Sequence, residues 1–129
     1  MSFRVRESLA LLPVAAAVFV LATCSSNPGG EGNGCASTGA NQTINGQDNL
    51  TYDRPSVTIS TGERVCWQNL GTVSHTVTAD FNASDTTWNI NGQLNPNLVV
   101  IKNFGTIGDY AYHCAFHQGT GMTGVIHVR

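Results

Sequence analysis

The stretch GDYAYHCAFHQGTGMTGVIHVR, residues 108–129, decides how the rest of the chain is interpreted. Both of its flanks alternate apolar and polar residues, as half-buried strands do. Between the flanks, one short loop carries Cys114, His117 and Met122. A thiolate, an imidazole and a thioether form a donor set that suits copper, and a complete site of this kind needs a second imidazole.

His75, in the alternating segment SHTVTADF at residues 74–81, is the candidate for that second imidazole. It lies well upstream and can approach the loop from a neighbouring strand. Two histidines and a cysteine with a weak axial methionine are typical of a blue-copper electron-transfer site. A lone histidine or methionine is more often a packing residue, but Met122 is the only methionine after residue 23.

The spacing Cys-x2-His-x4-Met, with Gly-x-Tyr-x-Tyr-x-Cys before it and Gly-Val-Ile-His-Val after it, closely resembles the C-terminal signature of the plastocyanin-like cupredoxins. The segment TGERVCWQN followed by SHTVT resembles that family's region around its first copper histidine. The resemblance implies an all-β, cupredoxin-like Greek-key β-sandwich of about seven to eight strands in a single domain. It also implies one copper ion per chain, bound by His75, Cys114, His117 and Met122.

The same resemblance implies roles for two neighbours of these ligands. Thr76 follows the first copper histidine where family members carry Asn, Ser or Thr, and its side chain would brace the ligand loop. Phe116 stands where plastocyanins commonly have proline, so the resemblance does not determine the stiffness of the loop or the reduction potential. Electrons would pass through the edge of His117, surrounded by Phe116, Gly119 and Gly121.

Seven short alternating or β-branched runs separated by turn residues independently favour a sandwich or barrel. No convincing amphipathic helix interrupts them, although an isolated helical turn in residues 83–94 is compatible with the pattern. The folded domain is expected over residues 43–129. Strands are expected at residues 50–53, 56–60, 64–70, 74–81, 98–104, 109–114 and 124–129.

Residues 1–23 are interpreted as a lipoprotein-type signal peptide. Arg4 and Arg6 precede an apolar run at residues 9–22, which is shorter than the roughly 20 residues that span a bilayer. The sequence LATC ending at Cys24 resembles a lipobox, in which that cysteine becomes the acylated first residue. Ordinary secretion with cleavage nearby is the alternative. Residues 24–42, rich in Gly, Ser and Asn, are expected to form a flexible tether.

The four cysteines divide by role. If Cys24 carries lipid and Cys114 binds copper, Cys35 and Cys66 remain as a possible disulfide, which an exported protein can keep. Two unpaired thiols are the alternative. The protein is then expected to be exported and to face the periplasm or cell exterior from a membrane anchor.

Composition excludes some functions. With 129 residues, 41% of them hydrophobic, the chain fits one small domain, and a net charge of −2 argues against a nucleic-acid partner. We expect a monomeric electron carrier that meets redox proteins transiently, such as cytochromes or an oxidase or reductase. A copper storage or delivery protein using the same site is the alternative. An enzyme is disfavoured because Met122 would fill the fourth coordination position.

Overall fold

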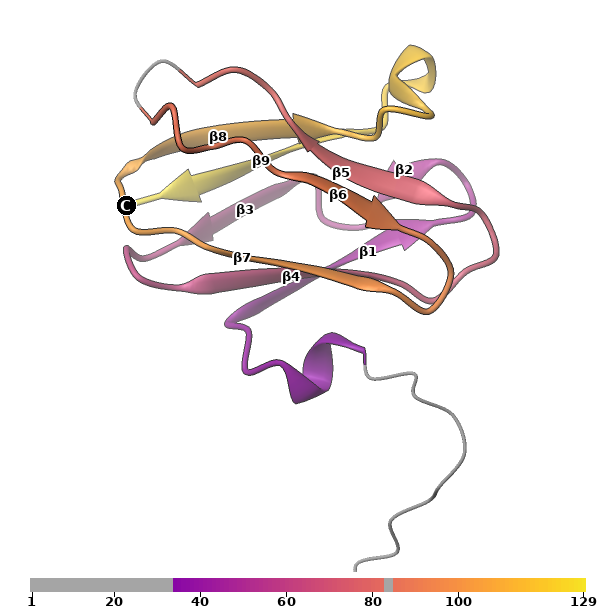
Figure 1. The fold of residues 1–129 in the computed structure, drawn as a ribbon, viewed down its shortest axis with the longest axis horizontal. Helices are drawn as coiled ribbons and strands as arrows, with labels where there is room; N and C mark the ends of the chain where they lie inside the picture. The colour runs from indigo at the N-terminus through magenta and orange to yellow at the C-terminus, as the bar shows by residue number, and fades with distance from the viewer. Residues whose placement is uncertain (1–33, 83–84) are drawn as a thin grey trace, which may run out of the picture. The chain divides into compact units, whose positions relative to one another are not determined.

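The computed structural model of the chain describes residues 34–82 and 85–129, which lie in one compact unit. Within these residues nine β-strands form two sheets, so the expected all-β sandwich is confirmed (Figure 1). The four-stranded sheet has the order β2 (Thr51–Tyr52), β1 (Gln42–Gln47), β4 (Arg64–Asn69) and β7 (Val99–Asn103). The five-stranded sheet has the order β3 (Ser56–Ile59), β9 (Thr123–Val128), β8 (Gly108–His113), β5 (His75–Ala79) and β6 (Asn91–Leu94).

All seven expected strands are present, but the sequence did not predict β1 and β6. Their sequences, QTINGQ and NGQL, are polar and contain only one β-branched apolar residue, Ile44. They form because of their neighbours: β1 runs parallel to β4, and β6 pairs antiparallel with β5. Strand propensity is strongly context-dependent, and here the pairing partners decide it.

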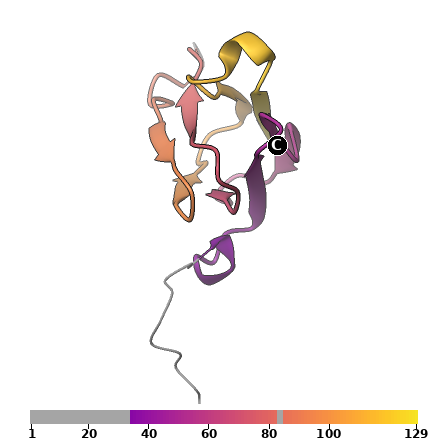
Figure 2. The ribbon, with the colours of Figure 1, turned by 90° about the vertical axis from the view of Figure 1, so that its right-hand side faces the viewer.

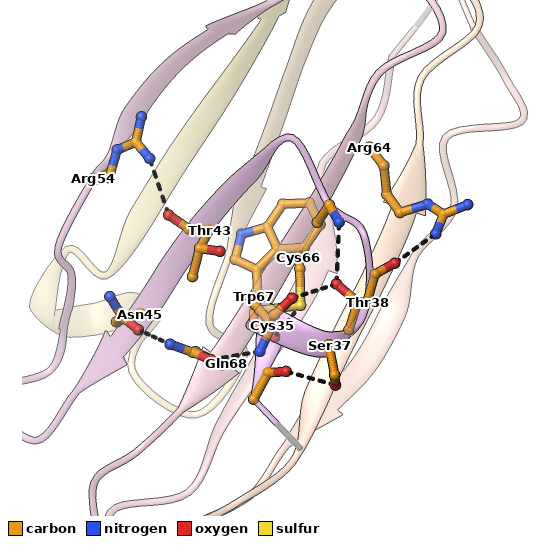
Figure 3. Close-up of a disulfide and its surroundings, with 12 residues drawn as sticks. Cys35, Ser37, Thr38, Thr43, Asn45, Arg54, Arg64, Cys66, Trp67 and Gln68 are labelled. Carbon is orange, nitrogen blue, oxygen red and sulfur yellow. Dashed lines mark hydrogen bonds between the residues drawn. A yellow bond between two sulfur atoms is a disulfide. The ribbon is translucent and has the colours of Figure 1, made fainter. Parts of the chain in front are cut away.

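The N-terminal part of the described chain is fastened to the four-stranded sheet (Figure 3). The 3₁₀ helix η1 (Cys35–Ser37) is joined to β4 by a disulfide between Cys35 and Cys66, with an S–S distance of 2.07 Å. The backbone N–H of Cys35 also donates to Gln68 Oε1 at 2.7 Å. The folded part of the chain therefore begins at least as early as Gly34, ahead of the expected boundary at residue 43. The expected signal peptide and Cys24 lie outside the described residues.

The two sheets face each other (Figure 2), and alternation along the strands places the buried side chains between them. Val65 and Trp67 are fully buried on the inner side of β4, whereas Cys66 between them meets η1 on the outer side. The Trp67 ring stacks edge-to-face on Tyr112 at 5.3 Å, and Tyr112 on Tyr52 at 5.0 Å. This aromatic cluster fills the centre of the sandwich and leads from the disulfide side toward the end of β8.

The register brings several loops to one end of the sandwich. Strand β8 ends at His113 and β9 begins at Thr123, and these two residues pair with each other. The connecting loop, residues 114–122, includes the 3₁₀ helix η2 (Gln118–Thr120). Strand β5 is antiparallel to β8 and begins at His75, beside this loop. No helix among the described residues has the length and apolar character that crossing a membrane requires.

Candidate metal centre

Three potential metal ligands from two distant parts of the sequence converge at this end of the sandwich. His75 is the first residue of β5, Cys114 follows β8, and His117 precedes η2. The Nδ1 atoms of the two histidines are 3.3 Å apart, and they lie 4.0 Å (His75) and 3.4 Å (His117) from Cys114 Sγ. Within residues 34–82 and 85–129, these three side chains form the group of histidine, cysteine or acidic residues whose ligand atoms lie close enough together to hold one metal ion.

Pairing between β5 and β8 explains the convergence. Thr78 lies opposite His113 in that antiparallel ladder. Two residues further along each strand, the same register sets Thr76 beside Ala115. The N–H of Ala115 donates to Thr76 Oγ1 at 2.7 Å, and the N–H of Thr76 points at Cys114 Sγ at 3.3 Å. Thr76 thus ties the ligand loop to β5 while its backbone contacts the cysteine sulfur.

Hydrogen bonds within the loop close it on itself. The N–H of Cys114 donates to the carbonyl of Met122 at 2.9 Å, and the N–H of His117 donates to the carbonyl of Cys114 at 3.1 Å. Gly121 has φ of 82°, a left-handed conformation that glycine adopts without steric cost and that turns the chain into β9. Met122 is fully buried, and its backbone lies directly across the base of the loop from Cys114.

The arrangement of the donor atoms fits a metal ion. Three ligands placed around one ion at metal–nitrogen and metal–sulfur distances of about 2.0 and 2.3 Å would lie about 3.5–3.7 Å from one another in a trigonal plane. The observed separations of 3.3, 3.4 and 4.0 Å bracket these values. A cation between the two Nδ1 atoms would use both lone pairs, and the mixture of thiolate and imidazole suits copper.

The electrostatic environment also favours metal binding. Burial lowers the pKa of His75 below its ordinary value, and the neighbouring His117 lowers it further by charge repulsion. The neutral imidazole, which is the form that binds a metal, is therefore favoured at this position. His75 is completely buried, whereas His117 is only partly buried, so the two histidines differ in their access to solvent.

Exposed apolar side chains lie at the end of the sandwich that holds the partly buried histidine. Phe116 is 56% exposed and its ring meets the ring of His117 edge-on, with centroids 6.4 Å apart. Leu70 and Leu98 are also exposed, and they follow β4 and precede β7 at the same end. The N–H of Asn69 donates to the carbonyl of Leu98, which holds these two loops together.

Two residues that support the site did not stand out as such in the sequence. Asn69 is fully buried and donates through Nδ2 to the carbonyls of Val73 and Leu94. Asp48 accepts hydrogen bonds from the loop that precedes His75. Nothing in its local sequence distinguishes Asp48 from any other aspartate in a turn.

The other histidines serve different contacts. His113 Nδ1 lies 2.6 Å from Asp80 Oδ1, and His127 Nδ1 lies 2.7 Å from Asp109 Oδ1. Neither histidine belongs to the cluster of His75, Cys114 and His117. Each imidazole has a carboxylate partner instead.

Comparison with known proteins gives consistent results. Residues 39–129 match the model for copper binding proteins of the plastocyanin/azurin family. A plastocyanin from Scenedesmus fuscus is 35% identical over 86 residues, covering 62% of this chain and 88% of the relative. The chloroplastic plastocyanin of Tetradesmus obliquus is 33% identical over 86 residues, and the match spans 62% of this chain but only 59% of that protein.

Solved structures agree in fold. A purple cupredoxin from Nitrosopumilus maritimus superimposes with a TM-score of 0.56 at 23% identity, over 68% of this chain and 99% of that one. The oxidized plastocyanin of Dryopteris crassirhizoma gives a TM-score of 0.59 at 20% identity, over 67% and 99% of the two chains. At these identities, the structural matches support the sandwich architecture alone.

Proposed function

This chain belongs to the plastocyanin/azurin family of copper binding proteins, and from that premise we propose that it carries single electrons between redox proteins. The observation that carries the proposal is the convergence of His75 Nδ1, His117 Nδ1 and Cys114 Sγ within 4.0 Å of one another. One bound copper ion would supply the chemistry by alternating between Cu(I) and Cu(II). The residues of the chain would bind the ion, hold its ligands in place and form the contact surface for partners.

Each ligand has a distinct task in this proposal. Cys114 provides a thiolate, and His75 and His117 provide neutral imidazoles. Met122 would supply its thioether as a fourth, weak ligand, because it is fully buried and its backbone lies across the base of the loop from Cys114. The hydrogen bond from the Thr76 N–H to the sulfur and the brace to Ala115 keep the ligands in place. Ligands held in this way would move little on reduction and oxidation of a bound copper ion, which would favour fast electron transfer.

The accessible edge of the site is assigned as the contact point for partners. His117 is the ligand that reaches toward solvent, and exposed Phe116 lies next to it. Leu70 and Leu98 are further exposed apolar side chains at the same end. Such a surface suits transient contact with cytochromes or an oxidase or reductase, through an interface below about 1,200 Å². The protein acts in this proposal as a monomeric carrier rather than an enzyme.

A location outside the cytosol is part of the proposal. The disulfide between Cys35 and Cys66 supports it, because disulfides persist mainly in oxidising compartments. The sequence before residue 24 adds the proposal of a lipid anchor at Cys24. In a bacterial host, Cys24→Ser should then release the protein from the membrane fraction. Equal membrane retention of the variant would argue against the anchor.

The central experiment is to load the full chain with Cu(II) and record visible absorption, paramagnetic resonance and the reduction midpoint. We expect an intense blue or green colour and a reversible one-electron midpoint. Rapid exchange of Cu(I) with a chelator, together with no reversible midpoint, would instead indicate copper storage or delivery. Absence of the visible band would contradict the proposed site.

A further inference from the structure

Asp48 reaches from the turn after β1 to the loop that leads into the metal centre. Its Oδ1 accepts the backbone N–H groups of Thr72 and Val73 at 2.8 and 3.0 Å, and its Oδ2 accepts the Thr72 hydroxyl at 3.1 Å. Thr72 and Val73 stand only three and two residues before His75. One carboxylate thus holds the segment that delivers the buried histidine to the site.

Gly71 shows how closely this carboxylate and the loop fit. A Cβ atom at position 71 would lie 2.1 Å from Asp48 Oδ1, which no side chain could tolerate without displacing the carboxylate. The backbone of Gly71 is not in the left-handed region. A side chain at position 71 would therefore push the Asp48 carboxylate away from the loop, because this carboxylate fills the space beside the glycine.

The same loop is held from its other side by Asn69. Its Nδ2 donates to the carbonyl of Val73, and its Oδ1 accepts the N–H of Gly71 at 2.9 Å. Residues 71–73 are therefore fixed between the end of β4 and the turn after β1. The segment that leads into β5 is thus held by hydrogen bonds on both sides.

Strand β1 also supports the ring of His75 itself. A Cβ atom at Gly46 would lie 3.0 Å from Cδ2 of His75, so the backbone of β1 packs closely against the imidazole. Asp48 follows Gly46 by two residues. The end of β1 and the turn after it therefore contact both the ring and the loop before it.

We propose that Asp48 is a positioning residue for the metal centre: by fixing residues 71–73, its carboxylate sets the approach of His75 to Cys114 and His117. This inference rests on the proposed copper site. The backbone N–H groups of Val73 and Thr72 lower the pKa of Asp48, so the carboxylate is ionised when it accepts these bonds. Its negative charge also acts on His75 and should favour Cu(II) over Cu(I).

The test compares Asp48→Ala with Asp53→Ala in the full chain. Asp53 is a matched control because its Oδ1 also accepts a backbone N–H, that of Asn45 at 2.7 Å, in the adjacent part of the same hairpin. Asp53 contacts the β1 strand and not the loop before His75. The two variants remove the same charge and the same kind of hydrogen bond.

The first measurement uses metal-free protein. Amide hydrogen exchange at Thr72 and Val73 should accelerate at least tenfold in Asp48→Ala and stay unchanged in Asp53→Ala. The second measurement uses copper-loaded protein. Asp48→Ala should shift the visible band and the copper hyperfine splitting, raise the reduction midpoint and speed the loss of Cu(I) to a chelator, whereas Asp53→Ala should change none of these.

Asp48→Asn distinguishes the effect of the hydrogen bonds to the loop from the effect of the negative charge. It also replaces Asp48→Ala in the test if the alanine variant fails to fold. Its amide oxygen can still accept the loop N–H groups, so it should keep most of the exchange protection and the spectrum while the midpoint still rises. Faster exchange with an unchanged spectrum and midpoint in Asp48→Ala would overturn the inference. Equal effects of Asp48→Ala and Asp53→Ala would also overturn it. A wild-type protein without the visible band would instead refute the proposed function, and the exchange data would still report on the loop.

Discussion

The two ends of the ladder formed by β8 and β9 use similar residues for opposite purposes. At the far end, Asp109 pairs with His127 in the ladder, and its Oδ1 lies 2.7 Å from His127 Nδ1 and 2.6 Å from Arg129 Nη2. At the metal end, Cys114 and His117 face a second imidazole, that of His75. At the far end a carboxylate is paired with basic side chains. At the metal end three lone-pair atoms that can bind a metal face one another instead.

Burial makes this difference matter. The side chain of Asp109 is 57% exposed, so water completes the partners of the far-end groups. His75 and Cys114 are fully buried, and a buried polar group without a partner is costly. The polar atoms at the far end form hydrogen bonds with one another. The ligand nitrogens and the sulfur at the metal end all carry lone pairs, so a cation is their best partner. A histidine by itself therefore does not mark a site; its burial and its partners do.

The largest expected effect is at the metal end. Cys114→Ser should abolish the intense visible band of the copper-loaded protein, because the band requires the thiolate. Asp109→Asn, at the far end of the same ladder, should leave the band intact and serves as the control. Visible absorption and paramagnetic resonance provide the measurement. A blue Cys114→Ser protein would remove this residue from the site.

The disulfide between Cys35 and Cys66 lies outside the β8–β9 ladder, and we expect it to affect the stability of the fold without affecting the copper site. Replacing Cys35 and Cys66 together by alanine opens a loop with a sequence separation of 31 residues. The chain-entropy model gives a loss of about 3–4 kcal/mol in the free energy of unfolding. Denaturant titration of the metal-free protein measures this loss. The visible spectrum after copper loading should not change, and a changed spectrum would show that the disulfide side and the metal end are coupled.

Thr76→Val tests the brace between β5 and the ligand loop. The valine has nearly the same shape but leaves the N–H of Ala115 without its acceptor at 2.7 Å. A lost buried partner costs about 1–3 kcal/mol in the free energy of unfolding, and Cu(I) should leave faster. The control Thr58→Val, at an exposed position of β3, should change the free energy of unfolding by no more than about 0.5 kcal/mol. Equal losses for the two variants would contradict the bracing role.

Met122→Leu tests the axial position with little change in packing. The swap nearly conserves volume, so it should cost less than about 1.5 kcal/mol in stability. The colour should persist while the reduction midpoint rises, because the thioether that stabilises Cu(II) has been removed. Voltammetry and visible spectroscopy measure both. If midpoint and spectrum stay as in the wild type, Met122 is not a ligand.

The smallest expected effect is at the far end. The hydrogen bonds from His127 and then Arg129 lower the pKa of Asp109 below its ordinary value of 3.8. Between the lowered and the ordinary pKa the unfolded chain binds more protons than the folded chain, so Asp109 stabilises the fold above its ordinary pKa and loses this effect as the pH falls through the lowered value. Asp109→Asn should therefore be slightly less stable than the wild type at about pH 7, and the difference should vanish once the pH is below the lowered pKa. A difference independent of pH would show that the carboxylate charge contributes nothing.

Local sequence was enough to predict most of the sandwich and the candidates for the metal centre. The alternating segments around Cys114 and His75 predicted β8 and β5, and seven of the nine described strands followed from such patterns. The spacing of Cys114, His117 and Met122 is short enough that one loop must hold them all. These features depend on residues close together in the chain, which is why a pattern could reveal them.

Other features depended on distant residues. Strand β1 is polar and forms because β4 lies alongside it, and Cys35 pairs with Cys66 because η1 folds onto the outer face of β4. The sequence left that pairing open as one of two alternatives. Asp48 became a candidate only when the fold brought its carboxylate to residues 72 and 73, across 24 positions of the chain.

The sequence by itself determined which side chains could bind a metal and which segments alternate as strands, because ligand chemistry and strand period are local properties. Only the tertiary structure decided that His75 meets Cys114 and His117, that the far-end histidine is already partnered by a carboxylate, and that a turn aspartate secures the approach of His75. Those outcomes depend on register and on close approach of backbones, which are set by the packing of the whole sandwich.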